Sequence, residues 1–415
     1  MGHAALLAGG CVRDLLMDRT PNDFDIASDA NPDEVSALFP SALTVGKAFG
    51  VTILPFDGFQ LEIATFREDL EYKDGRRPEG VRFSTPERDA QRRDFTVNAL
   101  FYDLETQQVI DFVGGQDDIK KRVIRTVGDP DQRFEEDKLR ILRAVRFAAQ
   151  LDFEIAPRTL EVVIRRANDV NVVSRERVRD ELTKLFKSQA LESGLSLLLY
   201  TGLLRALFPE LARAVFLEET LWLRRFEVAS VILSSSDANT ASITPLDWSA
   251  LWFSLFFYPL YQEGKEKELR THFSRDLKLE NKLIDSVLFA LRNHRKFLSP
   301  SGAREGELVL LLTHNDAKLA LQLAGVVERC AETLGKLSRA PTEREKKIEK
   351  LWIQRLGPQK RKPKPFLSGD DAKTCGLMPG PKLGELLQES YLMQLEGRLA
   401  NREEALTWLK TAAVT

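Results

Sequence analysis

The chain has 415 residues, of which 43% are hydrophobic and 29% charged, and its 60 Lys and Arg residues nearly balance its 62 Asp and Glu residues. This composition excludes a disordered or fibrous chain and predicts several globular units. No apolar run reaches the roughly 18 residues that a membrane helix needs. Three cysteines and four histidines are too scattered for a disulfide framework or a zinc site. Because the N-terminus lacks a secretion signal, we expect a cytoplasmic protein whose chemistry depends on carboxylates and arginines.

The sequence predicts an α+β head followed by an all-helical remainder. Up to about residue 115, short apolar runs alternate with helix signals, and from Glu135 onward helical periodicity dominates. Asn31 followed by Pro32 marks a helix start, and the charged stretch 67–78 is expected to be a loop. Strands are expected at 4–8, 23–27, 51–56 and 59–66, with a helix at 12–17 and a turn at Asp57-Gly58.

The first motif is Gly9-Gly10-Cys11-Val12-Arg13-Asp14, where a predicted strand turns into a helix. Two glycines let a phosphate group approach the backbone, and the helix N-terminus offers amide donors. Arg13 adds a bidentate contact. An ordinary tight turn explains the two glycines equally well.

The second motif, Asp23-Phe24-Asp25-Ile26-Ala27, begins ten residues after Arg13. Alternate residues of a strand point to the same side, so Asp23 and Asp25 are expected to direct two carboxylates at one Mg²⁺ site, while Phe24 and Ile26 face the core. A solvated strand face is the alternative. Glu62, on the predicted strand 59–66, is either a third acid, a general base or an edge-strand charge.

Two arginine-rich motifs follow. Arg92-Arg93-Asp94 predicts a cationic clamp for triphosphate or ribose, with a surface Arg–Asp pair as the alternative. The stretch 135–148 is predicted to be one helix, on which Asp137 and Arg140 lie one turn apart.

A carboxylate beside a guanidinium can identify a nucleobase. Cytosine and adenine present an amino donor next to a ring acceptor, whereas uracil and guanine present the reverse. The pair Asp137 and Arg140 therefore matches C and A. An exposed ion pair that contributes a few tenths of a kcal/mol is the competing interpretation.

Taken in order, these motifs resemble the class II tRNA nucleotidyltransferases, which comprise the bacterial CCA-adding enzymes and their poly(A) polymerase relatives. Ser174-Arg175-Glu176-Arg177 and the run 368–384 are similar to further motifs of that family. The resemblance implies a polymerase-β-like nucleotidyltransferase head at 1–128, a base-reading helical neck at 129–190, a helical body at 191–298 and a tRNA-binding helical tail at 299–415. The head begins almost at its first strand, without the leading helix that is usual in the family, and the sequence does not decide whether the start is truncated.

The resemblance also implies roles for individual residues. Asp23 and Asp25 would bind Mg²⁺, while Glu62 takes no firm role from the family. The tRNA 3′-hydroxyl would attack the α-phosphate of CTP or ATP and release pyrophosphate, with no DNA or membrane partner. The implied nucleotide contacts are Gly9, Gly10, Arg13, Arg93, Asp137, Arg140, Arg143 and Arg146.

Several related activities stay open at this point. The loop with Asp74-Gly75-Arg76-Arg77-Pro78 resembles that of CCA- and A-adding enzymes, which disfavours addition of CC only. A pI near 6.2 and the tail motif disfavour a poly(A) polymerase. Full CCA addition is therefore the prediction, and A addition is its main rival. A non-catalytic RNA-binding protein on a decayed head is disfavoured by the intact acids and glycines.

Overall fold

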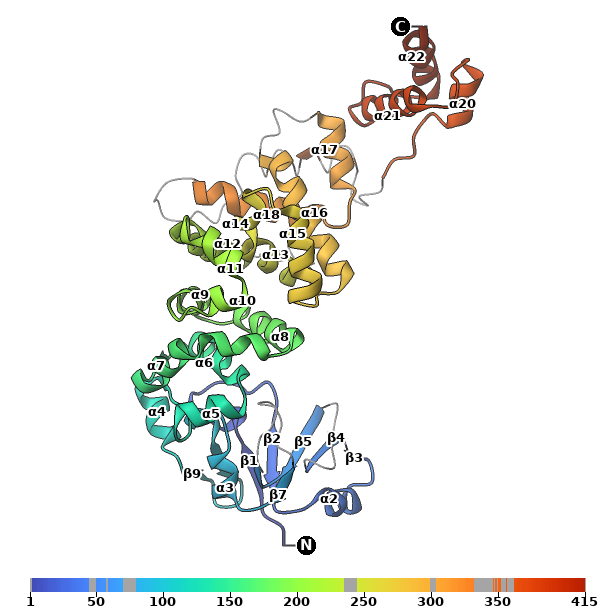
Figure 1. Cartoon of the computed structure of the whole chain (residues 1–415). Helices are drawn as coiled ribbons and strands as arrows, with labels where there is room; N and C mark the ends of the chain where they lie inside the picture. Colours follow the sequence, from blue (N-terminus) through green and yellow to red (C-terminus); the bar gives the residue numbers. More distant parts are fainter. Residues whose placement is uncertain are drawn as a thin grey trace. The chain divides into compact units, whose positions relative to one another are not determined.

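The computed structural model describes residues 2–44, 50–56, 59–69, 80–234, 245–298, 304–331 and 362–414, together with 346, 348, 350, 351 and 356. The chain divides into two compact units, Met1–Arg213 and Ala214–Thr415 (Figure 1). The finer boundaries predicted after residues 128, 190 and 298 lie inside these units and stay predictions. No helix of the described residues is long and apolar enough to cross a membrane.

The first unit contains a seven-stranded mixed sheet with the strand order β3-β4-β5-β2-β1-β8-β9. Its strands β2 and β5 are parallel, and Asp25 lies opposite Glu62 in their register. All other neighbouring strands of this sheet are antiparallel. The strands are β1 (Ala5–Ala8), β2 (Asp25–Ser28), β3 (Leu43–Thr44), β4 (Val51–Phe56), β5 (Phe59–Thr65), β8 (Leu100–Asp103) and β9 (Gln108–Asp111).

The predicted strands are confirmed, with corrections at two places. Strand β2 begins at Asp25, so Asp23 precedes the strand rather than belonging to it. Phe24, which was expected to face the core, is 37% exposed because it lies before the strand's alternation begins. Residues Arg67–Asp69 form β6, which pairs with β7 (Val81–Phe83), where a loop was predicted. The predicted turn at 57–58 and the segment 70–79 lie outside the described residues.

Apolar side chains on both faces hold the sheet in place. Leu6 and Ala8 of β1 pack into a cluster that also contains Ala27 and Phe101. Leu7, which lies between them in β1, packs on the other face against α1 (Gly10–Leu16). This alternation is the two-residue period of a strand buried on both sides. The cluster also includes Ala90 of α3 (Pro86–Gln91), which precedes the arginine motif. Helix α2 (Pro32–Leu38) begins as predicted, with a capping box between Asn31 and Glu34.

A layer of helices completes the first unit. Helix α6 is almost wholly buried and packs against α8 and α9. A Cβ on Gly194 of α9 would lie 2.6 Å from side chains of both Ala149 and Leu185, so glycine permits this close approach. The helices are α4 (Gly115–Lys121), α5 (Pro130–Glu136), α6 (Leu139–Leu151), α7 (Pro157–Arg165), α8 (Arg175–Phe186), α9 (Leu191–Tyr200) and α10 (Leu203–Leu207). Short 3₁₀ turns η2 (Thr96–Asn98) and η3 (Ala167–Val172) and a two-stranded ladder of β10 (Val123–Ile124) and β11 (Glu154–Ile155) connect them.

The single helix predicted over 135–148 is wrong. Helix α5 ends at Glu136, Asp137 has an extended backbone with φ −145° and ψ 105°, and α6 begins at Leu139. The Asp137 carboxylate accepts a hydrogen bond from the Leu139 amide at 3.0 Å. Aspartate competes with helical hydrogen bonding in this way, which explains why the helix is interrupted at this residue.

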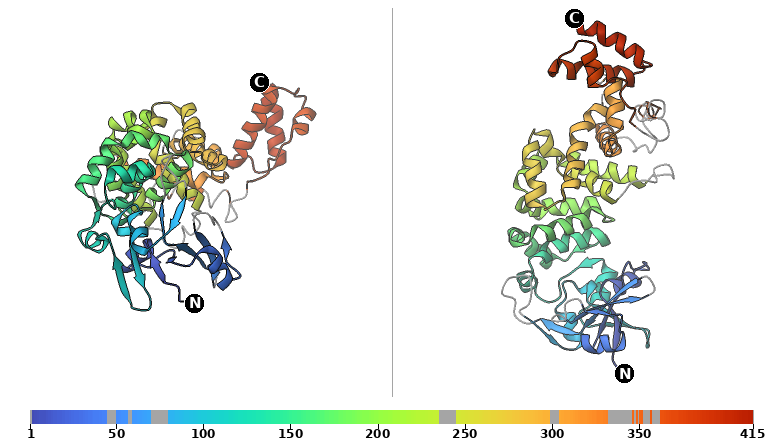
Figure 2. Two further views of the ribbon diagram at one scale, coloured as in Figure 1. Left: turned by 60° about the horizontal axis from the view of Figure 1, so that its bottom comes forward. Right: turned by 90° about the vertical axis from the view of Figure 1, so that its right-hand side faces the viewer.

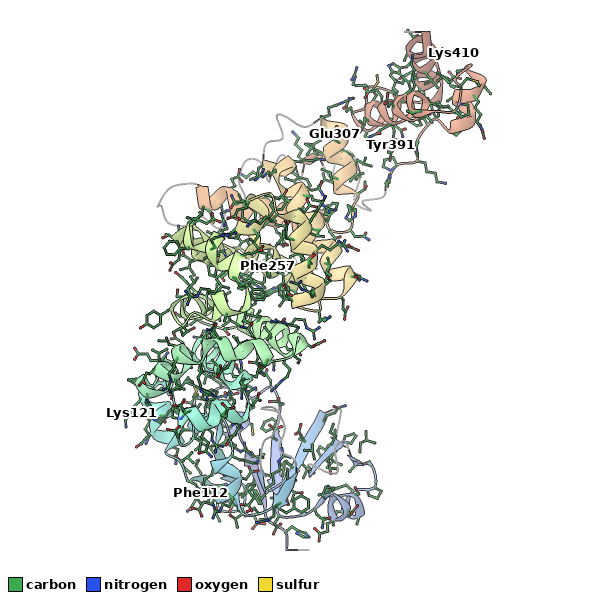
Figure 3. All side chains as sticks on the ribbon, viewed as in Figure 1. Phe112, Lys121, Phe257, Glu307, Tyr391 and Lys410 are labelled. Atoms are coloured by element: carbon green, nitrogen blue, oxygen red, sulfur yellow. The ribbon has the colours of Figure 1, made fainter. Side chains whose placement is uncertain are left out.

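The second unit is entirely helical among its described residues, as predicted for the remainder of the chain. Large aromatic side chains, including Trp222, Trp252 and Phe257, are fully buried in its core. Phe257 is labelled in Figure 3. Its helices are α12 (Glu219–Ser234), α13 (Pro245–Phe256), α14 (Tyr258–Gln262), α15 (Glu266–Thr271), α16 (Asn281–Leu298), α17 (Glu305–Leu312) and α18 (Ala317–Ala331), with a π-helical turn η5 (His272–Asp276). Helix α11 (Pro209–Phe216) crosses the boundary between the units.

The tail of the second unit is a cluster of three helices with its own apolar core (Figure 2). These are α20 (Gly369–Thr374), α21 (Pro381–Leu395) and α22 (Arg402–Val414). Helix α21 begins directly after Gly380, at the position where the Gly/Pro turn predicted a helix start. Lys382 is exposed beside this start.

Candidate active site

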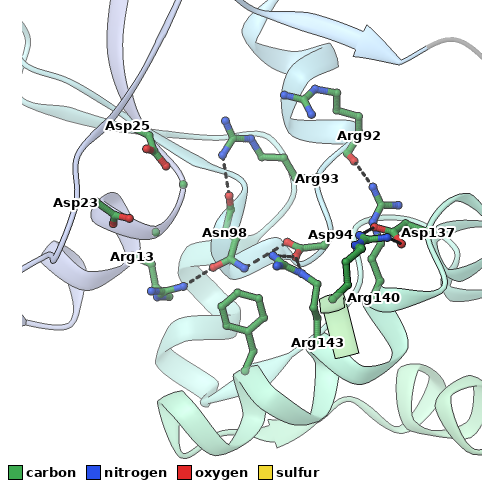
Figure 4. A pocket seen from close by; sticks show the side chains of 14 residues that line it. Arg13, Asp23, Asp25, Arg92, Arg93, Asp94, Asn98, Asp137, Arg140 and Arg143 are labelled. Atoms are coloured by element: carbon green, nitrogen blue, oxygen red, sulfur yellow. Dashed lines mark hydrogen bonds and ion pairs between the residues drawn. The ribbon is translucent and has the colours of Figure 1, made fainter. Parts of the chain in front are cut away.

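The first unit contains a cavity of about 480 Å³ between the sheet and the helical layer. Figure 4 shows side chains from several separate segments directed toward it. Every predicted site residue except Glu62 and Arg146 lies on its wall. The lining residues are Gly9, Gly10, Arg13, Asp23, Asp25, Arg92, Arg93, Asp94, Asn98, Asp137, Arg140, Arg143, Phe147 and Arg177. Six arginines against four aspartates make this wall suited to a polyanionic ligand.

One end of the cavity carries the two predicted metal ligands. Asp23 and Asp25 lie there (Figure 4), and Asp25 lies opposite Ala8, the residue before the Gly9-Gly10 turn, in the sheet. Gly9 has a φ of 78°, and a Cβ at this position would lie 2.8 Å from Nη1 of Arg93. Only glycine therefore fits between the turn and the arginine.

The acids at this end are short of positive charge. Partial burial, followed by repulsion from Glu62 and Asp23, raises the pKa of Asp25 to about 6, and Arg93 opposes this rise. A divalent cation would remove the repulsion, and two hard carboxylate oxygens are the donors that Mg²⁺ prefers. The donor set therefore fits the expected metal.

Glu62 lies outside the main cavity. It faces a second cavity of about 180 Å³ that shares Asp25, Arg92 and Arg93 with the first. Among the described residues, no three His, Cys, Asp or Glu side chains are grouped so as to hold a metal ion. Two carboxylates rather than three thus form the potential metal site, and the role of Glu62 stays a prediction.

Buried partners fix the two arginines nearest the acids. Arg13 is 4% exposed, forms an ion pair with Asp14 at 2.8 Å, and donates from Nη1 to Oδ1 of Asn98 at 2.5 Å. Arg93 donates from Nη1 to the Asn98 carbonyl oxygen at 3.1 Å and pairs with Asp89 at 2.9 Å. Because these contacts restrict the side chains, little rotational entropy is left to lose when a ligand binds.

Asp89 anchors both members of the Arg92-Arg93 pair. It is 1% exposed, and its carboxylate lies 2.6 Å from Nη2 of Arg92 as well as 2.9 Å from Nη2 of Arg93. Burial opposes ionisation of Asp89, but the two guanidinium groups override it and lower its pKa. Asp89 was not among the predicted site residues, although its position three and four residues before the two arginines indicated that it could pair with them.

The opposite end of the cavity is built around Asp94. Arg143 donates to Oδ2 of Asp94 from Nε at 2.9 Å and from Nη2 at 2.6 Å. Burial raises the pKa of Asp94, but the Arg143 guanidinium outweighs it and holds the pKa at about 2. Arg146, predicted to contact nucleotide, pairs instead with the buried Glu181 at 2.9 Å and does not line the cavity.

Asp137 and Arg140 both line the cavity, as expected for a base-reading pair, and each is held by further partners. Asp137 accepts hydrogen bonds from Arg177 at 3.1 and 2.6 Å. Arg140 pairs with Glu136 at 2.6 Å and donates to the Arg92 carbonyl oxygen at 3.1 Å. The extended backbone at Asp137 removes the helical spacing on which the prediction depended. Arg177 was noted only as part of a family motif, because no spacing in the sequence connects it with Asp137.

An aromatic ring completes the wall. Phe147 is 6% exposed, and the guanidinium carbons of Arg143 and Arg146 lie 5.1 and 3.4 Å from its ring centroid. Arg13 lies 5.7 Å from the same centroid on the side of the acids. Cation–π contacts of this kind fix an arginine without consuming its hydrogen-bond donors.

Two family models match the first unit. Residues 5–125 match the poly A polymerase head domain, and residues 152–215 match the probable RNA and SrmB-binding site of polymerase A. The CCA-adding enzyme of Levilactobacillus brevis is 34% identical over 420 residues, which cover 100% of this chain and 94% of that enzyme. The CCA-adding enzyme of Bacillus licheniformis is 45% identical over 207 residues, an alignment that spans 50% of this chain and 52% of that enzyme.

A solved structure extends the likeness along the whole chain. The crystal structure of the Bacillus stearothermophilus CCA-adding enzyme in complex with CTP superimposes with a TM-score of 0.74 and 30% sequence identity. The match covers 98% of this chain and 93% of that one. A mixed α+β head followed by a helical remainder is therefore the fold that this chain shares with that enzyme, which confirms the predicted fold class and the resemblance.

Proposed function

Because the chain belongs to the CCA-adding enzyme family, a family of nucleotidyltransferases, we propose that it adds C, C and A to the 3′ end of tRNA from CTP and ATP. One observation supports this most strongly. A single cavity holds two unneutralised carboxylates at one end and an Asp–Arg cluster at the other, so one nucleoside triphosphate can contact both. The protein itself then identifies the base, and no template strand is needed.

The reaction is the attack of the RNA 3′-hydroxyl on the α-phosphate, which forms a phosphodiester bond and releases pyrophosphate. Asp23 and Asp25 would hold Mg²⁺, which when bound neutralises charge on the phosphates and activates the attacking hydroxyl. Arg13 and Arg93 bind the phosphates from fixed positions. Glu62, opposite Asp25 in the sheet, is our choice for the carboxylate that accepts the hydroxyl proton.

Asp137 and Arg140 are the proposed base-reading pair. Arg177 and the Leu139 amide together occupy three of the positions at which the Asp137 carboxylate can accept, and a carboxylate has about four of them. The remainder can accept from the amino group of cytosine or adenine. Uracil and guanine would present a carbonyl oxygen to the same carboxylate, and such an unpaired contact is strongly penalised.

Arg143 and Arg146 take different parts in this proposal. Arg143 lines the cavity and can contact the nucleotide directly. Arg146 lies behind the wall, paired with Glu181, and supports Arg143 and Phe147 from there.

The tRNA would be bound by segments beyond the cavity. The match at 152–215 concerns RNA binding in polymerase A, and the start of α21 with Lys382 offers amide donors and a cation to RNA phosphates. Basic residues between 344 and 355 could also contact RNA phosphates. Of these, Lys346 and Lys350 are the two that fall among the described residues. The cytoplasmic location and the lack of a DNA partner stay predictions.

A test with three substrates separates the members of the family. Purified protein receives a tRNA that ends at the discriminator base, a tRNA that ends in C-C, and oligo(A), each with one labelled nucleotide at a time. We expect incorporation of C on the first and of A on the second. Incorporation of A alone, on the second substrate only, would instead indicate an A-adding enzyme.

Two further results of the same test would contradict the proposal. Long A tracts on oligo(A) would indicate a poly(A) polymerase. No incorporation on any substrate, with RNA still bound, would indicate a non-catalytic RNA-binding protein on a decayed head. The loop at 74–78, which disfavours addition of CC only, lies outside the described residues, so this assay also decides that point.

A further inference from the structure

Asn98 lies between the two ends of the cavity (Figure 4). It is 8% exposed and ends the 3₁₀ turn η2. The turn is tightly held: Thr96 donates from Oγ1 to Asp118 at 2.7 Å, and a Cβ on Gly115 would lie 2.3 Å from the Thr96 carbonyl oxygen. The backbone of Asn98 therefore has little freedom, and its side chain has a fixed position.

The side-chain amide of Asn98 bonds to both ends. Its Oδ1 accepts from Nη1 of Arg13 at 2.5 Å, and its Nδ2 donates to Oδ1 of Asp94 at 3.3 Å. The other oxygen of Asp94 accepts from Arg143 at 2.9 and 2.6 Å. A continuous path of hydrogen bonds thus runs from the arginine beside the metal-binding acids to the arginine at the base-reading end.

Only an amide of this size can make both bonds. Asparagine donates and accepts at once, whereas an ionised aspartate can only accept. Aspartate at position 98 would keep the bond from Arg13 but would place a second negative charge against Asp94. Alanine would break both bonds. The residue type at this position therefore determines whether the two ends are connected.

We propose that Asn98 is a specificity-determining positioning residue that couples the phosphate-binding end of the cavity to its base-reading end. The triphosphate is the same in all four nucleotides, so contacts with it cannot by themselves distinguish the bases. Because Asn98 holds the two ends in a fixed register, a base that fits the reading end brings its phosphates onto Arg13, and a wrong base does not. The coupling is reciprocal, as linkage requires. This role rests on the proposed function.

The test compares two variants of Asn98 with the wild type. For each protein we would measure kcat/KM for CTP and UTP on a tRNA without C-C-A, and for ATP and GTP on a tRNA ending in C-C. In Asn98→Asp, discrimination against UTP and GTP should fall by about tenfold, a typical coupling between two sites. Inhibition by pyrophosphate should stay within about twofold of wild type, because Arg13 keeps its acceptor. In Asn98→Ala, discrimination should fall and pyrophosphate inhibition should also weaken.

Asn293→Asp is the matched control, because it makes the same change at a half-buried position of the second unit. Asn293 donates to the Phe289 carbonyl oxygen at 2.9 Å and lines no part of the cavity. Its discrimination should equal that of the wild type. Melting temperatures of all the variants show whether each one folds.

Two results would overturn the role of Asn98. One is an equal loss of kcat/KM for correct and wrong nucleotides, which indicates a purely structural side chain. The other is unchanged discrimination in both variants. A wild-type protein that incorporates neither C nor A would overturn the proposed function first, and the role of Asn98 with it, so the two failures are distinguishable.

Discussion

The two ends of the cavity differ in how their carboxylates are neutralised. At the metal end, Asp25 has neighbouring acids and a pKa raised to about 6 by partial burial and by those acids. At the base-reading end, Asp94 is bound by Arg143 and has a pKa of about 2, and Asp137 is bound by Arg177. One end therefore has carboxylates whose repulsion a bound cation would relieve, while the other is already organised by the protein's own arginines.

The largest expected effect lies at the metal end. We expect Asp25→Asn to reduce nucleotide incorporation by about a thousandfold or more, because a ligand of the expected Mg²⁺ is lost. The same change should not destabilise the metal-free protein at pH 8, since it removes a repelled charge. Incorporation assays and urea unfolding check the two statements.

Asp117→Asn is the control for this change, because Asp117 is exposed on α4 and lines no part of the cavity. Its activity should match the wild type. Full activity in Asp25→Asn would show that the assignment of the metal end is wrong.

At the base-reading end, replacing an aspartate should lower the free energy of unfolding. Asp94→Ala leaves Arg143 without its main partner, and breaking a buried ion pair costs about 3 kcal/mol of unfolding free energy. The depressed pKa of Asp94 means that this contribution is present at neutral pH and is lost as the pH falls from about 4 toward 2. Urea unfolding at pH 7 should therefore separate the variant from the wild type. Equal stabilities would show that this end is not held by the pair.

Asp89→Asn should produce a smaller loss of activity, together with a loss of stability, because Asp89 is buried between two guanidinium groups that lower its pKa. Arg92 and Arg93 would lose the charge that orients them, so we expect KM for CTP and ATP to rise by about thirtyfold, equivalent to about 2 kcal/mol. In an Arg93→Ala background, Asp89→Asn should change KM less than it does in the wild type, because one of the two arginines that Asp89 orients is absent. Effects that simply add in the double variant would contradict this positioning role.

The smallest expected effect concerns pH. The proton competes with the metal for Asp25, so metal affinity should rise by about tenfold between pH 5 and pH 7 and then level off. Because the pKa of Asp25 is raised by folding, the metal-free protein should also gain stability as the pH falls from 6 toward 4.

Glu62→Gln sharpens this prediction, because it removes the negative charge of Glu62, whose repulsion is the second cause of the raised pKa of Asp25. Metal affinity would be measured by Mn²⁺ titration at a series of pH values. The pH at which the affinity is half of its plateau value should then move below 6. An unchanged midpoint would mean that Glu62 does not influence Asp25.

The strands and the placement of Asp23 and Asp25 together on the cavity wall were predictable because their signals are local. The alternation of apolar residues in β5 and the Gly9-Gly10 turn both follow from neighbouring residues in the sequence. Asp23 and Asp25 are only two positions apart, so one short segment brings them together. The base-reading end depends on contacts between distant segments. Arg177 reaches Asp137 from 40 residues away, and the break between α5 and α6 is stabilised by tertiary contacts that periodicity does not reveal.

The most direct test of the central claim, that the protein itself identifies the base, compares Asp137→Ala with the wild type on a tRNA that ends in C-C. Each nucleoside triphosphate is supplied alone, and kcat/KM is measured for all four. We predict that the wild type strongly prefers ATP and that Asp137→Ala accepts GTP and UTP nearly as well. A variant that keeps the wild-type preference would contradict the claim.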